Sequence, residues 1–309
     1  VAERPTLRPD AIHRGDGGEV VVWSDDTTRF AGTISARGGA AGGNGGDVEV
    51  SGKQTLLFRG DVDTRAPLGE RGTLLLDPDD LLISNDVGAI DDADVSIAAG
   101  GANVTVSANY LSGYTGATIT LAAGRDITFK DAVTNTTAGT SLTATAGDTL
   151  TISSGASIQV DGDLTLSGSS IVLQGNLNSA AGQVQLTGPV ALQGQDITIA
   201  GASVVIGDAI SSAQRALSIT ATNGGITLGG NVRLSQSGDT LALSATGGAI
   251  SAKALTTDDG AITLNSASGL TLAGNVDSGS SASHLTRPGA LCADALRSHP
   301  RAFGHARPS

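Results

Sequence analysis

One short pattern returns along most of this 309-residue chain. From about residue 94 to residue 276, five-residue runs alternate small apolar and small polar side chains, and each run ends near a Gly, Asn or Asp. Examples are Ala117–Leu121, Asp163–Ser167, Asp196–Ala200 and Ala261–Asn265. Alternation with a period of two places one face of a strand in the interior and the other in water. The pattern therefore predicts a long series of short β-strands.

The strands also recur at a nearly constant interval. The first apolar residues of the major strands are Ile119, Leu142, Leu164, Val184, Leu217, Leu241 and Ile262, and only the step from Val184 to Leu217 is clearly longer than the others. A Gly-Asn-Leu/Val corner recurs at residues 175–177, 230–232 and 274–276. A period near 22 with two or three strands per repeat is typical of a β-solenoid, whose coils stack around one core. A β-sandwich is the alternative, but sandwiches lack a repeated corner and usually contain core aromatic residues.

The composition fits an all-β solenoid. Gly accounts for 44 residues, aromatic residues for only 2%, and Met is absent, so the apolar positions are mostly Val, Ile, Leu and Ala. The net charge of −12 argues against a nucleic-acid partner, because phosphate binding needs clustered Lys and Arg. A single Cys excludes an internal disulfide. We find no signal peptide and no apolar run long enough to span a membrane, and the lack of Met predicts a piece of a longer polypeptide.

Changes in amino-acid composition and repeat pattern divide the chain into four segments. We expect a leader segment at residues 1–11, a glycine-rich β-helical block at 12–90, solenoid repeats of about 20–24 residues at 91–279, and an aberrant tail at 280–309. The tail contains three of the four His, the only Cys and three of the eight Pro. Such an abrupt shift predicts that the tail is disordered.

The segment Val20–Ile83 carries a set of motifs in a fixed order. They are Trp23 followed by Asp25 and Asp26, then Phe30–Gly39, Val48–Lys53 and Gly72–Pro78. With these motifs the segment, roughly a fifth of the chain, closely resembles a block of filamentous-haemagglutinin-like exoproteins, the large secreted partners of bacterial two-partner secretion systems. The family's amino-terminal secretion domain, with its Asn-Pro-Asn-Gly motif, is not found in this sequence, so we do not expect the chain to direct its own export.

The resemblance implies a fold, a location and partners. The fold would be a right-handed parallel β-helix, the shaft of an elongated adhesin that is secreted or exposed on the surface of a Gram-negative bacterium. Its partners would be a host-cell glycan or receptor and, during secretion, a β-barrel transporter of the outer membrane.

The glycine-rich stretch Ser35–Gly52 has the composition of a ligand loop. Residues 42–50 supply the glycines and the Asp of the calcium-binding nonapeptide, but Glu49 stands where that repeat needs a large apolar residue, and the flanking nonapeptides do not match it. No Gly-Lys-Ser/Thr ends the run, so it is not a P-loop. We therefore expect a wide corner between Ile34 and Val48 that binds neither calcium nor phosphate.

Nucleophilic and metal-binding residues are sparse. Cys292, His284 and His299 form a superficial Cys/His set, but all lie in the aberrant tail, and His305 adds no spacing suited to a metal. The body contains only His13, without a nucleophile elbow to accompany it. We therefore predict no catalytic residues, no cofactor and no metal site.

Adjacent carboxylates are a further candidate site, because β-helices also host enzymes that cleave polysaccharides. The pairs are Asp25-Asp26, Asp79-Asp80, Asp91-Asp92 and Asp258-Asp259. Adjacent residues of a strand point to opposite faces, so the members of a pair should not converge on one substrate. Between Asp131 and Asp259 the only cationic residues are Arg215, Arg233 and Lys253. We interpret the pairs as solvated turn residues.

Pairs of Thr in Thr-x-Thr order are the last candidate, since rows of Thr occur in ice-binding proteins. They are Thr118/Thr120, Thr143/Thr145, Thr149/Thr151 and Thr220/Thr222. Their spacing is irregular and Thr has a high β-propensity, so we interpret them as ordinary strand surface. The prediction is thus a non-enzymatic structural segment of an adhesin, without stable insertion in a membrane. The alternatives are the stem of a contact-dependent toxin delivery exoprotein and a carbohydrate-active β-helix protein.

Overall fold

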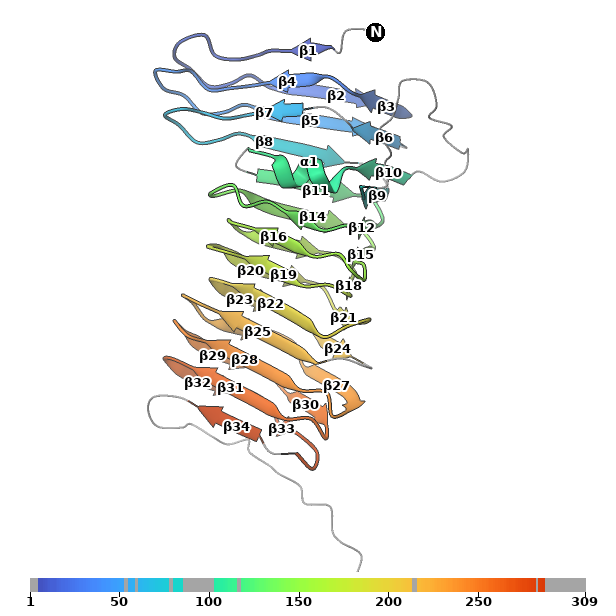
Figure 1. The fold of residues 1–309 in the computed structure, drawn as a ribbon, viewed down its shortest axis with the longest axis vertical. Coiled ribbons are helices and arrows are strands. Elements are labelled where there is room, and N and C mark those ends of the chain that lie inside the picture. The colour runs from blue at the N-terminus through green and yellow to red at the C-terminus, as the bar shows by residue number, and fades with distance from the viewer. Residues whose placement is uncertain are drawn as a thin grey trace, which may run out of the picture.

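The chain forms a long parallel β-solenoid (Figure 1). The computed structural model describes residues 5–52, 55–58, 61–77, 80–85, 103–115, 118–212, 216–281 and 283–286. The chain winds around one long axis, and strands of successive coils pair in parallel. The prediction of an all-β solenoid from the alternating five-residue runs is confirmed.

The strands belong to four sheets, which we call A to D. Sheet A contains β1 (Thr6–Leu7), β4 (Thr33–Ser35) and β7 (Asp61–Asp63). Sheet B contains, in spatial order, β2 (Val20–Ser24), β5 (Asp47–Gly52), β8 (Thr73–Asp77), β11 (Thr118–Ala123), β14 (Ser141–Ala146), β17 (Leu164–Ser167), β20 (Gln183–Thr187), β23 (Ser203–Ile206), β26 (Ile226–Leu228), β29 (Ala249–Ala252) and β32 (Gly269–Leu272).

The other two sheets complete the cross-section. Sheet C contains β3 (Thr27–Phe30), β6 (Thr55–Phe58), β10 (Asn103–Val106), β9 (Asp80–Ile83), β12 (Ile127–Phe129), β15 (Thr149–Ile152), β18 (Ser170–Leu173), β21 (Val190–Leu192), β24 (Ile210–Ser212), β27 (Val232–Ser237), β30 (Leu255–Asp258) and β33 (Val276–Asp277). Sheet D contains β13 (Val133–Thr134), β16 (Ile158–Val160), β19 (Leu177–Ser179), β22 (Ile197–Gly201), β25 (Leu217–Ala221), β28 (Leu241–Ala245), β31 (Ile262–Ser266) and β34 (Ser283–Thr286).

From β11 onward each coil contributes one strand to sheet B, one to sheet C and one to sheet D, in that order along the chain. Equivalent positions lie above one another: in sheet B, Ile119 pairs with Leu142, which pairs with Leu164. All three side chains are fully buried. Burying an aliphatic side chain of this size is worth about 1.5–3 kcal/mol, so these internal columns hold the coils together.

One interval in the predicted series needs correction. The long step from Val184 to Leu217 does not mark a long coil, because the two residues lie on different faces. Val184 is in sheet B and pairs with Val204, whereas Leu217 is in sheet D and pairs with Ile197. In each of these pairs the two residues belong to successive coils of ordinary length. Short runs that look alike on all three faces explain why the sequence period could be followed onto the wrong face.

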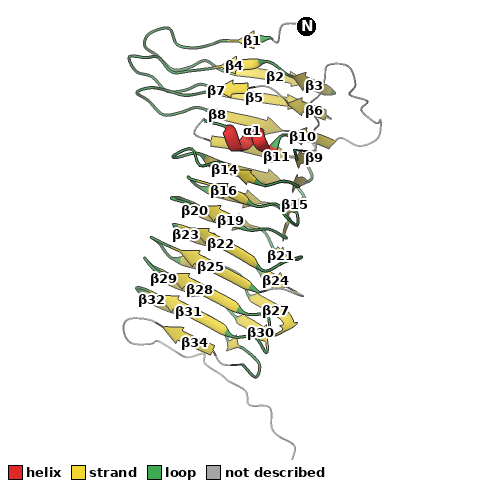
Figure 2. Cartoon of the chain, in the orientation of Figure 1, coloured by secondary structure: helices red, strands yellow, loops and turns green. Residues whose placement is uncertain are grey.

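In the part of the chain that is described, the regular winding is interrupted once, near the predicted boundary at residue 90. Strand β10 lies between β6 and β9, out of chain order, and the short helix α1 (Ala108–Gly113) follows it. Among the described residues α1 is the only helix (Figure 2). Sheet A in the first coils and sheet D in the later coils form one side of the solenoid, which we call the third face. Helix α1 lies on this face, after the last strand of sheet A (β7) and before the first strand of sheet D (β13).

Where sheet A ends and sheet D begins, side chains of α1 and its neighbours form hydrogen bonds with backbone groups. The Tyr110 hydroxyl accepts the backbone N–H of Val62 in β7 (3.1 Å). On the other side, the Asn135 amide donates to the carbonyl oxygens of Leu111 (2.8 Å) and Tyr114 (2.7 Å). Since a buried unpaired backbone group is costly, this arrangement explains how the third face can break without destabilising the core.

The C-terminal boundary also differs from the prediction. Residues 283–286, expected in the disordered tail, form β34 and pair with β31 in sheet D. The solenoid therefore continues past residue 279. The rest of the predicted tail, 287–309, lies outside the described residues, as do residues 86–102 at the start of the predicted repeats.

Candidate functional site

The glycine-rich stretch forms a wide corner, as predicted. Residues 36–46 join β4 to β5, between similar loops at 9–18 and 64–72. The neck of each loop is closed by a backbone hydrogen bond of 2.8 Å, and the three donor–acceptor pairs are Gly18–Pro9, Gly46–Ala36 and Gly72–Thr64. We call the three loops the loop stack; they project together from one side of the solenoid (Figure 1).

Close backbone contact explains why Gly46 and Gly72 of the loop stack are glycine. A methyl group on Gly46 would overlap loop 9–18, at 2.7 Å from the carbonyl carbon of Gly17. A methyl group on Gly72 would lie 2.8 Å from the carbonyl carbon of Gly45 in the loop before it. Neither Gly46 nor Gly72 has a positive φ, whereas Gly42 (φ +126°) and Gly43 (φ +121°) do. The glycine run therefore serves both the close stacking of the three loops and the turn of loop 36–46.

The carboxylates in and beside this corner have protein partners. Asp16 accepts the backbone N–H of Asn44 (2.7 Å), and Asp47 accepts the hydroxyl of Thr73 (2.6 Å). Glu49 accepts the hydroxyl of Ser51 (2.8 Å). Within the described ranges, no group of three His, Cys, Asp or Glu comes close enough together to hold a metal ion.

Acidic and amide side chains at other corners also bind backbone, generally in a neighbouring coil. A side-chain oxygen accepts a backbone N–H, at 2.6–3.0 Å, in the pairs Asp126–Thr149, Asp161–Gly139, Asp163–Gln183, Asn176–Thr198, Asp208–Gly188 and Asp259–Ser280. We call these side chains coil clamps. Asp259 is also a member of one of the adjacent acidic pairs, so the interpretation of those pairs as solvated turn residues is incomplete for this residue.

Hydrogen bonds of this kind shift the pKa of Asp131. The backbone N–H of Asn85 (2.6 Å) and the hydroxyl of Ser84 (3.0 Å) both donate to one carboxylate oxygen. These bonds favour the ionised form and hold the pKa of Asp131 below its usual value. The charge of Asp131 thus contributes to the contact between its own coil and the coil that contains β9.

The structure describes some members of the adjacent acidic pairs, and these residues have different surroundings. Asp25 and Asp26 are exposed in the turn between β2 and β3. Asp80 forms an ion pair with Arg125. Asp79, Asp91 and Asp92 lie outside the described residues.

Asp258 and Asp259 have different roles because Asp258 ends β30 and Asp259 lies in the turn after it. Asp258 is exposed at the end of β30, whereas Asp259 turns back as a coil clamp that holds Ser280.

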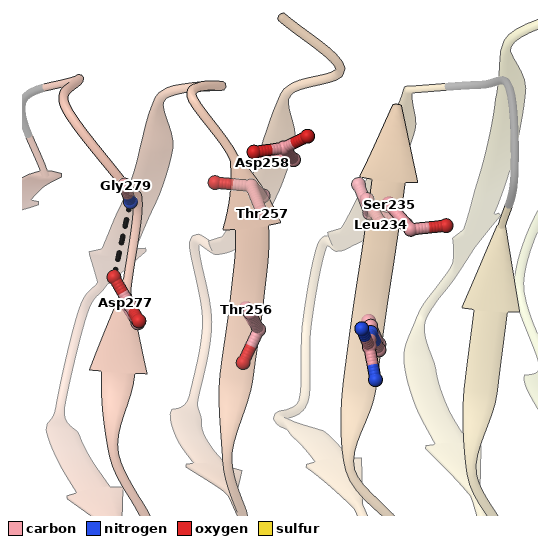
Figure 3. A pocket seen from close by; sticks show the side chains of 8 residues that line it. Leu234, Ser235, Thr256, Thr257, Asp258, Asp277 and Gly279 are labelled. Atoms are coloured by element: carbon pink, nitrogen blue, oxygen red, sulfur yellow. Dashed lines mark hydrogen bonds between the residues drawn. The ribbon is translucent and has the colours of Figure 1, made fainter. Parts of the chain in front are cut away.

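A shallow cleft of about 310 Å³ lies on the outer side of sheet C, at β27, β30 and β33 (Figure 3). Arg233, Thr256 and Asp277 occupy equivalent positions on the three strands, as their pairing shows. Ser235 and Asp258 extend the rim along the strands. Since neighbouring strands are about 4.8 Å apart, the row from Arg233 to Asp277 spans about 10 Å between its α-carbons.

The cleft coincides with two backbone irregularities. The pairing of β27 with β30 shifts register between Leu234 and Ser237, the one such shift among the strand pairs that the structure describes. Asp259, which follows β30, has φ of +57° and is the single described non-glycine residue in the left-handed region. A bulge spreads and twists neighbouring strands, and bulges and strained residues occur often beside functional sites. The cleft is therefore the best candidate site.

The charges in the cleft are mixed. Arg233 lies at one side, with Asp258 and Asp277 across the row. None of the three ion pairs found within the described ranges involves Arg233. Asp277 accepts the backbone N–H of Gly279 (3.0 Å), which leaves further lone pairs on its carboxylate for a ligand.

A second hollow, of about 340 Å³, lies beside α1 and β7. Both of its phenol hydroxyls have hydrogen-bond partners: the Tyr110 hydroxyl accepts the backbone N–H of Val62, and the Tyr114 hydroxyl is 3.0 Å from that of Thr64. Burial raises the pKa of Tyr110 and raises that of Tyr114 to about 12, so both phenols are neutral. We interpret this hollow as part of the joint between sheets A and D.

The remaining predicted candidates do not form a site in the part of the chain that is described. His13 is exposed in the loop stack, and Lys253 is exposed on the loop between β29 and β30. Arg215, Cys292, His299 and His305 lie outside the described residues, and only the backbone of His284 is described, in β34. The Thr-x-Thr pairs are spread over sheets B, C and D and make no single face.

The sequence analysis missed the carboxylates of the cleft as a pair. Asp258 and Asp277 are distant in sequence, and they meet only because they lie on successive coils. A search at the interval of one coil, instead of between adjacent residues, would have aligned Arg233, Thr256 and Asp277, and Asp258 lies two residues after Thr256 on the same strand.

No protein-family model matches the chain, and no curated protein matches it. None of the described helical residues forms a segment with the length and apolar character needed to cross a membrane.

Proposed function

We propose that the chain is a structural and adhesive segment of a secreted bacterial surface exoprotein, part of the shaft of a filamentous-haemagglutinin-like adhesin. The observation that carries the proposal is the motif series in Val20–Ile83, which lies in a solenoid of the kind that such a shaft requires. A stiff rod holds its two ends apart and presents polar strand surfaces along its length. In this role the chain extends the adhesin away from the cell and binds its partners through many weak contacts.

The proposal includes a location and partners. The chain would pass through a β-barrel transporter of the outer membrane and remain outside the cell, where it would contact a host-cell glycan or receptor. The acidic, Thr- and Ser-rich surface supports this role, because net charge keeps an exposed rod soluble.

Two measurements test the proposal. Antibodies raised against the purified chain should label intact cells of the source bacterium, and external protease should remove the label. Beads that carry many copies of the chain should attach to host cells more strongly than beads with an unrelated acidic protein, because many weak contacts add to a strong one. Labelling only after the cells are permeabilised, together with equal attachment of both kinds of bead, would contradict the proposal.

A carbohydrate-active β-helix protein is the second candidate, and the cleft is the observation that favours it. Two carboxylates on neighbouring strands, Asp258 and Asp277, are the groups that glycoside hydrolysis uses. Release of new reducing ends from polysaccharides by the wild-type chain, lost in Asp258→Asn, would establish this activity in place of simple binding.

A further inference from the structure

We infer that the cleft on sheet C binds a neutral saccharide unit. The inference rests on the proposed function, for which it names a class of ligand and a place. It begins from the irregular pairing of β27 with β30, which forms a hollow in a sheet whose other described strand pairs keep their register. A bulge re-aims side chains, so the residues around it can point toward a common centre.

The polar groups of the rim select a ligand that both donates and accepts hydrogen bonds. Arg233 offers only donors, Asp258 and Asp277 offer only acceptors, and Thr256 and Ser235 offer hydroxyls that do both. Each hydroxyl of a sugar can donate to a carboxylate and accept from a guanidinium or from another hydroxyl. A row with both kinds of partner therefore fits a polyhydroxyl ring.

The charges of the rim argue for a neutral ligand. An anionic sugar would be repelled by Asp258 and Asp277, and Arg233 offsets only one of these two charges. The ammonium group of an amino sugar would be attracted by the carboxylates but repelled by Arg233, which lies in the same row. A neutral sugar meets neither penalty and can still form charge-assisted hydrogen bonds with all three residues.

The size of the cleft fits one sugar ring. Its volume of about 310 Å³ lies at the lower end of the range of ligand pockets, which is roughly 300–1,000 Å³. Leu234 and Thr257 also line it, but both are buried and alternate with the outward residues of their strands, so a ligand would meet mainly the polar side chains of the outer face.

Titration followed by NMR tests the inference on the whole chain. The probes are the methyl glycosides of glucose, galactose and N-acetylglucosamine, with galacturonate and glucosamine as charged comparisons. At least one neutral glycoside should shift the side-chain Nε–H resonance of Arg233 and the backbone amide resonances of Thr256 and Asp277, with a Kd on the order of 1–10 mM for so small a ligand.

Variants locate the binding. Arg233→Gln and Asp277→Asn should each weaken the binding about tenfold, because each removes a charge-assisted hydrogen bond. Lys253→Gln and Asp148→Asn are matched controls, since both residues are exposed and neither lines the cleft, and they should bind as the wild type does. Far-UV dichroism shows whether each variant is folded, and the Arg233 resonance of the wild type reports binding even if a variant is not.

Several results would overturn the inference: stronger binding of galacturonate or glucosamine than of the neutral glycosides, unchanged affinity in both cleft variants, or no shift at concentrations on the order of 50 mM. If the glycosides do not bind while chain-coated beads still attach to cells, the cleft is refuted and the adhesive role remains. If the glycosides bind but neither attachment nor surface labelling is seen, the proposed function fails and the cleft remains.

Discussion

Replacing Gly46 by alanine tests why the loop stack needs glycine. The new methyl group would lie 2.7 Å from the carbonyl carbon and 2.9 Å from the carbonyl oxygen of Gly17, and it would overlap the carbonyl oxygen of Gly18. These atoms are backbone, so the overlap can be relieved only by moving loop 9–18 away from loop 36–46. Overpacking of this kind costs about 1–3 kcal/mol.

The unfolded chain contributes a smaller effect of opposite sign. Alanine restricts the unfolded state, which stabilises a protein by about 0.4–1 kcal/mol where the folded backbone accepts it. We therefore expect Gly46→Ala to lower the free energy of unfolding of the first coils by about 1–2 kcal/mol net. Gly269→Ala is the matched control, because its methyl group would meet only Ala249 Cβ at 3.9 Å, an ordinary contact, and its φ is not positive.

Hydrogen exchange followed by mass spectrometry is the suitable assay, because coils of a solenoid contact mainly their neighbours and can unfold locally. Peptides from residues 9–52 should exchange faster in Gly46→Ala, while peptides from sheet D should exchange as in the wild type. Gly269→Ala should slow exchange or leave it unchanged. Equal protection of residues 9–52 in Gly46→Ala and the wild type would refute the argument from backbone contact.

Three further predictions concern the core and the titrating groups. Leu166→Ala should cost about 2–5 kcal/mol in urea unfolding because Leu166 is fully buried, whereas Thr165→Ala, on the outer face of the same strand, should change stability by about 0.5 kcal/mol or less. The pKa of Asp131 is lowered in the folded state, so its contribution to stability is present above the usual value of 3.8 and is lost as the pH falls below that value. The urea midpoints of unfolding at about pH 7 and about pH 3 should therefore differ less in Asp131→Asn than in the wild type. The pKa of Tyr114 is raised to about 12 in the folded state, so its contribution to the free energy of unfolding is present below about pH 10, where the unfolded phenol ionises, and is lost between pH 10 and 12. Tyr114→Phe should therefore lose less free energy of unfolding than the wild type over this range, the difference being at most about 3 kcal/mol. An equal loss of stability in either variant and the wild type would contradict the corresponding assignment.

Much of the fold follows from the sequence because its signals are local and repeated. Alternation in runs such as Asp163–Ser167 is enough to predict a strand with one buried face, and the repeat interval is enough to predict stacking. The face on which a strand lies is a different matter. The runs that begin at Val184 and at Leu217 look alike in sequence, and only the pairing shows that they belong to sheets B and D.

Features that depend on contacts between coils were not predictable from local patterns. Helix α1 is six residues long and replaces a strand on the third face, and β10 pairs out of chain order. The cleft lies at a register shift between β27 and β30, which no local signal in either strand reveals. For the glycine run the predicted corner is present, but the reason for Gly46 is the backbone of the neighbouring loop, which belongs to a different coil.

The coil clamps make length an easily changed property of this molecule. The Asp163 carboxylate accepts the backbone N–H of Gln183 in the following coil, and that of Asp259 likewise accepts the backbone N–H of Ser280. A duplicated unit of about two dozen residues therefore includes the side chain that hydrogen-bonds it to the next coil. Inserting such a unit adds about 4.8 Å to the rod and leaves both ends unchanged. The distance between the ends can therefore grow or shrink by duplication and deletion in small, equal steps, without any new interface having to arise.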